Sequence, residues 1–296
     1  LELCRRVSVM PRSVVPAECT TVTAHIDVQG PLLYYAVCAF TPKFGGSCIE
    51  YGTLPRQGLY FTLDQARRGH STLAHAYPSH DQSGQLRSAV RDLIKSLNRD
   101  YVREGGTTLP LARVLVDGRW KLEAVEQGVR DSQCPVALVS LGNGITASRA
   151  PMALWPDKPG QINGHFWCVR PIRQGRPVAH IDTNYWKTEL HESLICEPEN
   201  EQALTLYQAT AAEHQMIGEH LAAERGIPAT AAGRRVVEWH ERRKGRDNHL
   251  WDNIVGCFAG ASMSGIVKPG IADIEPEKPK RPPAPIKSKR VAIRRR

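Results

Sequence analysis

Three aspartates stand at positions where packing alone does not require an acid. Asp27 ends the alternating segment TTVTAHIDVQG, Asp117 ends the apolar run ARVLVDG, and Asp252 lies about two residues off the apolar face of NHLWDNIVGCFAGASMSG. Taken singly, Asp27 and Asp117 could be turn residues, because aspartate is favoured in turns before glycine. Taken together, the three acids indicate a cluster of carboxylates.

Two carboxylates at the ends of adjacent parallel strands repel each other unless a cation or a proton joins them. Mg²⁺ prefers carboxylate and water oxygens, and a third carboxylate from a helix could complete a site for two ions about 4 Å apart. Such a site polarises a phosphodiester, activates water and stabilises the leaving oxygen. We therefore predict Asp27, Asp117 and Asp252 as catalytic and metal-binding residues, with Mg²⁺ or Mn²⁺ as cofactor and hydrolysis of DNA strands as the reaction.

The elements that would position these acids follow from hydrophobic periodicity. Residues 20–30, 32–40 and 47–55 predict three strands joined by short turns, which is an antiparallel meander. A helix at 86–104 leads to the apolar strand that ends at Asp117. An amphipathic stretch at 120–131 and an apolar run at 136–142 follow, and this order of strand, helix and strand predicts parallel pairing.

The second half of the chain predicts a hairpin and three helices. HFWCVRPI and RQGRPVAHID read as the hairpin, and TNYWKTELHESL reads as a helix. Residues 201–225 predict another helix, and 248–265 predict the last one, with Asp247 as its N-cap. Gly256 and Gly260 would let that helix press closely on a sheet, since they lack side chains.

This order of elements predicts an α/β fold of the ribonuclease H-like class, in which a mixed sheet of a three-strand antiparallel meander plus parallel strands is flanked by helices. Residues 20–267 would form this domain. We expect residues 1–19 to be an irregular lead-in or linker, and 268–296 to be a basic, proline-rich flexible tail.

Composition restricts the class of protein further. The 296 residues carry a formal net charge of +9, most of it in the tail, which suggests an anionic partner. No run of eighteen apolar residues occurs, and the charged first residues do not form a signal peptide, so we expect no membrane association. The eight cysteines are scattered without a CxxC pair, which favours reduced core thiols in a cytoplasmic protein over zinc or disulfides.

The motifs around the three acids resemble those of a known family. TAHIDVQGPLLYYAVCAF with SCIEYGTLP resembles the first nuclease motif of lambda-type large terminase subunits of bacteriophages, VLVDGRW resembles their second acidic segment, and DNHLWDNIVGCFAGASM resembles their closing motif. The resemblance extends over residues 14–267 and places Asp27, Asp117 and Asp252 at the metal-binding positions.

The resemblance implies the C-terminal nuclease domain of a terminase, which cuts concatemeric double-stranded DNA in the cytoplasm of the infected bacterial host. It also implies an upstream ATPase domain, a small terminase subunit and a portal as partners. No GxxxxGK[ST] phosphate loop occurs in this chain, so we expect no ATP hydrolysis by it. The middle acid could instead be another carboxylate, among them Glu50, Glu123 and Asp182.

Basic residues before the last helix are candidate DNA contacts. Arg242, Arg243, Lys244 and Arg246 could bind phosphates or form a solvated loop, and His249 could reach the metal or a phosphate or be a polar residue of the first helical turn. Two alternative functions stay open. One is a transposase or junction resolvase of the same fold, and the other is a DNA-binding or motor-docking module with a degenerate nuclease site.

Overall fold

The structure is a computed structural model that describes residues 2–172 and 176–268. In this part of the chain, ten strands form one mixed sheet and two more form a separate hairpin. The strands of the large sheet are β1 (Thr21–Val28), β2 (Leu33–Phe40), β3 (Gly46–Leu54), β4 (Asp100–Val102), β5 (Thr108–Asp117), β6 (Ala137–Asn143), β7 (Ile162–Gly164), β8 (Trp167–Ile172), β9 (Arg176–Asp182) and β10 (Leu204–Leu206). The hairpin consists of β11 (Glu224–Ala231) and β12 (Arg234–Glu241). The helices are α1 (Leu63–Arg68), α2 (Leu73–Ala76), α3 (Gln82–Leu97), α4 (Leu122–Ser132), α5 (Thr183–Ile195), α6 (Gln215–Leu221) and α7 (His249–Met263), with short 3-10 turns η1 (Leu3–Arg5) and η2 (Met152–Leu154).

The strand order in the large sheet is β10-β3-β2-β1-β5-β6-β9-β8-β7, and β4 pairs with β5. Strands β1, β2 and β3 form the predicted antiparallel meander. Strand β5 lies parallel to both β1 and β6, and β6 lies parallel to β9. The predicted ribonuclease H-like mixed sheet is therefore confirmed, and the carboxyl ends of β1, β5, β6 and β9 share one edge.

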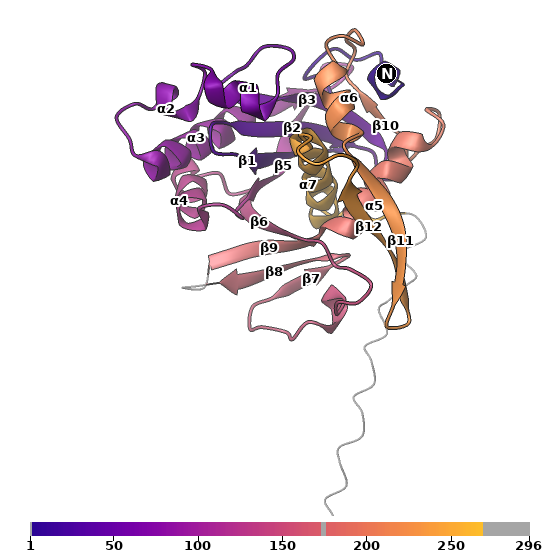
Figure 1. Ribbon diagram of the computed structural model, residues 1–296. Helices are drawn as coiled ribbons and strands as arrows, with labels where there is room; N and C mark the ends of the chain where they lie inside the picture. The colour runs from indigo at the N-terminus through magenta and orange to yellow at the C-terminus, as the bar shows by residue number, and fades with distance from the viewer. Residues whose placement is uncertain (1, 173–175, 269–296) are drawn as a thin grey trace, which may run out of the picture.

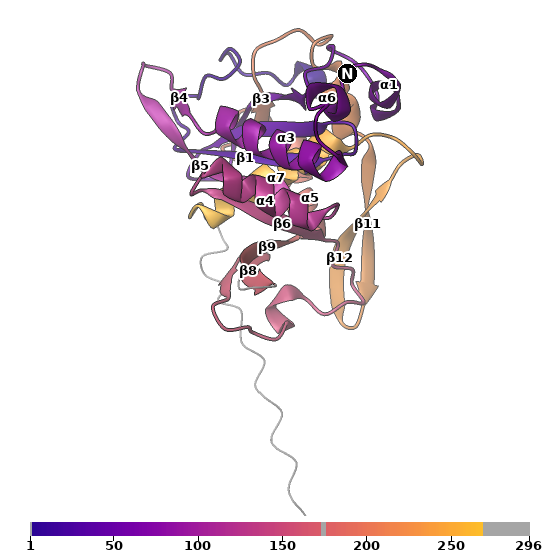
Figure 2. The ribbon, with the colours of Figure 1, turned by 90° about the vertical axis from the view of Figure 1, so that its left-hand side faces the viewer.

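Helices cover both faces of this sheet (Figures 1 and 2). Helices α3 and α4 pack on one face, where they share an apolar core with Val22, Ala24 and Ile26 of β1. Helices α5, α6 and α7 cover the other face and share a second core with β2 and β9. Burial on two sides explains why β1 and β5 are rich in Val, Ile, Leu and Ala, because each face of such a strand meets apolar side chains.

Helix α7 approaches β1 more closely than a side chain would allow at one position. A Cβ atom on Gly256 would overlap the ring of His25, so only glycine fits there, as predicted, whereas a Cβ on Gly260 would meet only ordinary contacts. The predicted N-cap Asp247 is wrong. Its carboxylate accepts a hydrogen bond from the backbone of Leu63 at 2.6 Å, and His220 of α6 instead accepts one from Leu250 N–H at 3.1 Å.

The predicted helix at 201–225 is also wrong. Its first part forms β10, which pairs in parallel with β3, and α6 occupies only Gln215–Leu221 before β11 begins at Glu224. Alanine and glutamate favour a helix weakly, and pairing with the edge of the sheet outweighs that preference here. The predicted helix at 86–104 begins earlier, at Gln82, and ends at Leu97 because β4 then pairs with β5.

The first residues are irregular, as expected, but they pack onto the domain. Val15 and Cys19 are fully buried, and short bridges join Val7 to Leu206 and Val15 to Arg103. The predicted tail, apart from Lys268, lies outside the described residues. Within the described part, no helix is long and apolar enough to cross a membrane, and the eight cysteines are free thiols.

Candidate active site

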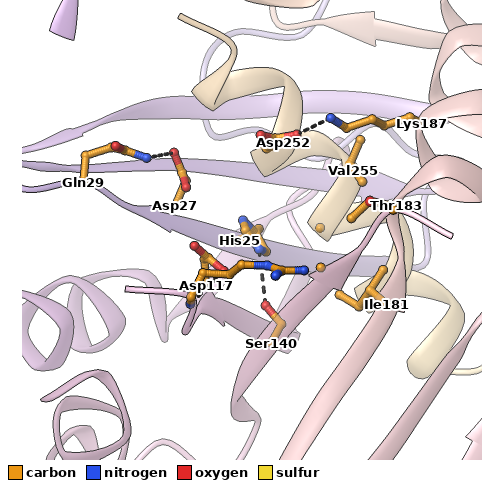
Figure 3. A pocket seen from close by; sticks show the side chains of 14 residues that line it. His25, Asp27, Gln29, Asp117, Ser140, Ile181, Thr183, Lys187, Asp252 and Val255 are labelled. Atoms are coloured by element: carbon orange, nitrogen blue, oxygen red, sulfur yellow. Dashed lines mark hydrogen bonds and ion pairs between the residues drawn. The ribbon is translucent and has the colours of Figure 1, made fainter. Parts of the chain in front are cut away.

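The three predicted aspartates line one cavity at the carboxyl edge of the parallel strands (Figure 3). Ile26 of β1 lies opposite Val116 of β5, so the next residues, Asp27 and Asp117, follow on adjacent strands. Asp252 lies in the first turn of α7, and its side chain lines the same cavity. The cavity has a volume of about 370 Å³. The topology thus brings together side chains that are far apart in the sequence.

Asp27 is the most firmly held of the three carboxylates. His249 Nδ1 lies 2.8 Å from Asp27 Oδ2, and Gln29 donates to the same oxygen at 3.0 Å. Burial raises the pKa of Asp27, but the hydrogen bond from His249 and the charge of its ring outweigh burial and lower that pKa overall. Asp27 is therefore ionised at neutral pH and has a fixed orientation.

Asp117 has the opposite character. Burial and the neighbouring charge of Asp27 raise its pKa to about 7, although the backbone N–H of Arg119 donates to its Oδ1 at 3.2 Å. Near pH 7, a carboxyl group with this pKa is protonated in part of the molecules and ionised in the rest. The cluster thus contains more negative charge than the surrounding protein groups neutralise.

Asp252 is joined to a lysine that the sequence analysis did not single out. Lys187 of α5 lies 3.0 Å from Asp252 (Figure 3). It also lies 2.7 Å from Glu224, at the start of β11. Burial lowers the pKa of Lys187, but the two carboxylates raise it above its ordinary value. Burial also raises the pKa of Asp252 against the opposing charge of Lys187. A lysine on the inward face of the predicted helix TNYWKTELHESL was the only sequence signal for this contact.

His249 has a different environment from the one expected of a surface residue. It is buried, its ring stacks on Tyr34 at 4.5 Å, and its Nδ1 is directed to Asp27. Burial lowers the pKa of His249, but the carboxylate of Asp27 raises it overall. The side chain therefore belongs to the carboxylate cluster.

A second histidine lies beneath the carboxylates. His25 Nδ1 is 2.9 Å from Asn253 Oδ1, and His25 Nε2 is 3.4 Å from the hydroxyl of Ser140. Burial lowers the pKa of His25, so the ring is neutral. Sequence analysis passed over it because a histidine inside a strand has no distinctive pattern. Its ring fixes the spacing between β1 and α7, the two elements that carry Asp27 and Asp252.

The other acids considered for the middle position do not line the cavity. Glu50 is bound by Arg99 at 2.6 Å and by the hydroxyl of Ser13 at 2.7 Å. Asp182 caps α5, where its carboxylate accepts from the backbone of Asn184 at 3.1 Å. Glu123 lies in the first turn of α4 and is exposed.

The four basic residues predicted to contact DNA are exposed in the turn between β12 and α7. Arg242 is anchored there, because its Nε donates to the backbone carbonyl of Glu224 at 2.8 Å. Since α7 carries Asp252, this basic turn directly precedes the helix of the candidate site. The others of the set are Arg243, Lys244 and Arg246.

As they stand, no three His, Cys, Asp or Glu side chains of residues 2–172 and 176–268 are arranged so that they could hold a metal ion. The carboxylates of Asp27 and Asp252 are instead occupied by His249 and Lys187. The chemistry of the donors fits a hard divalent cation, because three carboxylates face one cavity and Asp117 is poised to lose its proton.

Comparison with known proteins assigns the chain to a family. The family profile of the terminase large subunit gpA endonuclease domain matches residues 1–271. The chain belongs to this family. The terminase nuclease family functions in phage DNA packaging, which favours this reading over the transposase and resolvase alternatives.

A search of curated proteins gave no match. Among solved structures, the chain is similar to a mutant nuclease domain of the large terminase subunit gp2 of the bacterial virus Sf6, in a structure with manganese. The two are 12% identical with a TM-score of 0.40, and the similarity covers 81% of this chain and 89% of that one.

Proposed function

We propose that this terminase nuclease domain cuts concatemeric double-stranded DNA in the cytoplasm of the infected bacterial host by a hydrolysis that requires Mg²⁺ or Mn²⁺. Asp27, Asp117 and Asp252 would hold the metal, which we expect to be two ions. The observation that carries the proposal is the convergence of these acids from two adjacent parallel strands and a helix on one cavity. An upstream ATPase domain, the small terminase subunit and the portal would be partners of the complete protein.

The electrostatics of the cavity support a cation requirement. Asp27 is ionised, and its negative charge helps to raise the pKa of Asp117 to about 7, so the two carboxylates repel each other when both are ionised. A divalent ion would remove this repulsion and would supply the polarisation of the phosphodiester and of the attacking water. Without such an ion, an anionic phosphate would meet like charge in the cavity.

Neighbouring side chains would hold the three aspartates in position. His249 orients the carboxylate of Asp27 by a hydrogen bond of 2.8 Å, and Lys187 holds Asp252 at 3.0 Å. Lys187 keeps its charge because two acids contact it, so it also places a cation at the wall of a cavity that receives a phosphate. His25 is neutral and keeps β1 and α7 in register beneath the site.

The test is plasmid cleavage by the full chain with Mg²⁺, with Mn²⁺ and with EDTA, for the parent and for Asp27→Asn. Asparagine preserves the size of the side chain but removes the charge that a hard cation needs, so cutting should fall at least about 100-fold while folding is kept. Asp100→Asn is the matched control, because it makes the same chemical change at an exposed residue outside the cavity.

Undiminished cutting by Asp27→Asn would show that Asp27 is only a turn residue, and the proposal would fail. Cutting that continues in EDTA would refute the metal requirement. A parent protein that binds DNA but never cuts it would favour the degenerate binding module instead.

A further inference from the structure

A buried arginine without a counter-ion lies on the other face of the sheet. Arg170 of β8 is 9% exposed, and its Nε and Nη2 atoms have no hydrogen-bond partner. Within residues 2–172 and 176–268, no carboxylate lies within ion-pair distance of its guanidinium. Enclosing a charge without a partner is unfavourable, because the lost hydration is not replaced. An arginine in this state therefore has unused capacity for an anion.

Two aromatic side chains surround this arginine. Its Cζ lies 5.0 Å from the centre of the Trp155 ring, and the ring of His180 lies 5.8 Å from that of Trp155. Neither nitrogen of His180 has a hydrogen-bond partner in the described structure. Cys168 of β8 pairs with His180 of β9, and residues two apart share a face of a strand, so Arg170 and His180 face the same side.

Further cations lie around this Arg170 cluster, which we define as Arg170, Trp155 and His180. Burial and the charges of Arg170, Lys158 and Arg119 lower the pKa of His180 to about 4, so its ring is neutral at physiological pH. Lys158 and Arg119 are both exposed, and neither has an ion-pair partner among the described residues. The cluster is thus positively charged and reaches the surface.

Asp157, the one acid among residues 144–166, forms no ion pair with these cations. The carboxylate of Asp157 lies 3.4 Å from the side-chain amide of Gln161 and 3.3 Å from that of Asn163. Both amides donate to it. Asp157 keeps its negative charge, but the three cations Arg170, Lys158 and Arg119 outnumber it, so the net charge around the cluster stays positive.

The Arg170 cluster flanks the carboxylate cavity. Asp117 of β5 lies opposite Ser140 of β6, and the next residue of β6, Leu141, lies opposite His180 of β9. Two strand spacings separate the positions, which corresponds to about 10 Å across the sheet. Arg119 connects them, because it lines the carboxylate cavity and its charge also acts on His180.

We propose that the Arg170 cluster binds a backbone phosphate of the DNA whose scissile phosphate lies at the carboxylates, an inference that rests on the proposed function. A guanidinium offers several N–H donors in a fixed plane that matches phosphate oxygens, and a lysine at the rim adds a point charge. Trp155 holds the guanidinium in place from one side by a cation–π contact. DNA along the carboxyl edge of the sheet would reach Arg119 first and Arg170 beyond it.

The experiment measures binding of a short labelled duplex to the full chain in EDTA, by fluorescence anisotropy between about 50 and 200 mM salt. The variants are Arg170→Gln and Lys158→Gln. The charge-matched control is Arg5→Gln, an exposed residue of η1 at the opposite end of the molecule from β8 (Figures 1 and 2). Loss of one phosphate contact should lower the slope of log K against log salt by about 0.9 and raise Kd about eightfold at 0.1 M salt.

Arg5→Gln should leave the slope at the parent value. Arg170→Gln should melt close to the parent without DNA, because the arginine has no ion pair to lose and gives up only its cation–π contact with Trp155. If Arg170→Gln does not fold, Lys158→Gln decides, since that residue is exposed. A parental slope and Kd in both variants would overturn the proposal. A second combination of results would also overturn it. If both variants bind the duplex as tightly as the parent, and inorganic phosphate raises the melting temperature of the parent but not of Arg170→Gln, the site binds free phosphate.

Failure of this inference is separable from failure of the nuclease proposal. Binding in EDTA does not depend on cutting, so Arg170→Gln can weaken DNA binding even in a protein that never cleaves. Conversely, metal-dependent cutting that is lost in Asp27→Asn would stand if Arg170 proved irrelevant to DNA.

Discussion

Replacing Asp117 by asparagine should make the metal-free protein more stable at pH 8. The pKa of this carboxyl is raised to about 7 by burial and by the charge of Asp27, so the folded state binds its proton more tightly than the unfolded chain does. The folded protein is therefore favoured at low pH, and stability falls as pH rises from about 4 through 7. Asparagine cannot ionise, so the variant should not lose this stability as pH rises.

The magnitude follows from the difference between a pKa of 3.8 and one of about 7, which corresponds to at most about 4 kcal/mol. The side chain is partly exposed, so solvent screening reduces this value, and we expect about 2 kcal/mol at pH 8. For a domain of this size, about 2 kcal/mol raises the melting temperature by about 5 °C. At pH 5 Asp117 is protonated when folded, and most of the difference should disappear.

The assay is thermal melting in EDTA from pH 5 to pH 8, repeated with Mn²⁺, for the parent, Asp117→Asn and the exposed control Asp100→Asn. Mn²⁺ should stabilise the parent more than Asp117→Asn, since a ligand stabilises a protein only as far as it binds the folded state. The reasoning would be refuted if Asp117→Asn melted below the parent at pH 8 in EDTA, or if its difference from the parent were the same at pH 5.

Three further predictions follow from the contacts around the site and from the charge of the chain. Changing His249 to Leu removes the 2.8 Å hydrogen bond to Asp27, so plasmid cleavage should fall about tenfold with duplex affinity in EDTA unchanged; equal cleavage would show that His249 does not position Asp27. Changing Lys187 to Met leaves Glu224 and Asp252 facing each other without a cation, so denaturant unfolding at pH 7 should show a loss of about 3 kcal/mol, and a stability equal to the parent would contradict the ion pairs. Deleting residues 270–296, which carry nine Lys and Arg against three acids, should weaken duplex binding at low salt without changing cleavage chemistry; a deletion that unfolds the domain would place its boundary elsewhere.

The central part of the fold was predictable because its signals are local. Alternation in TTVTAHIDVQG and the apolar runs that end at Asp117 and at Gly142 identify strands by period and composition, and the helical stretch between those runs requires a parallel pair. The incorrect helix at 201–225 shows the limit of such signals. Its residues prefer a helix only weakly, and Leu204–Leu206 pair in parallel with the edge strand β3 instead.

The hairpin of β11 and β12 shows the same limit from the other side. Strand β11 contains Gly226 and Pro228, and the two ends of β12 carry four charged or basic residues, a composition that resembles a solvated loop. The two strands pair along their full length, from Glu224 with Glu241 to Ala231 with Arg234. Only pairing partners supplied by the folded chain distinguish such a segment from a loop.

The sequence by itself determined which acids stand out and which elements carry them, because hydrophobic periodicity identifies the strands and the helix and places an aspartate where packing does not require one. Only the tertiary structure decided their electrostatic states and their partners. Asp27 and Asp117 have the same side chain and equivalent strand positions, yet a hydrogen bond from His249 lowers the pKa of the first, and burial beside the first raises the pKa of the second. Contacts between residues more than 200 positions apart, such as His249 with Asp27, depend on the packing of α7 against β1. Sequence periodicity carries no information about such distances, because it reports only which face of one element is apolar.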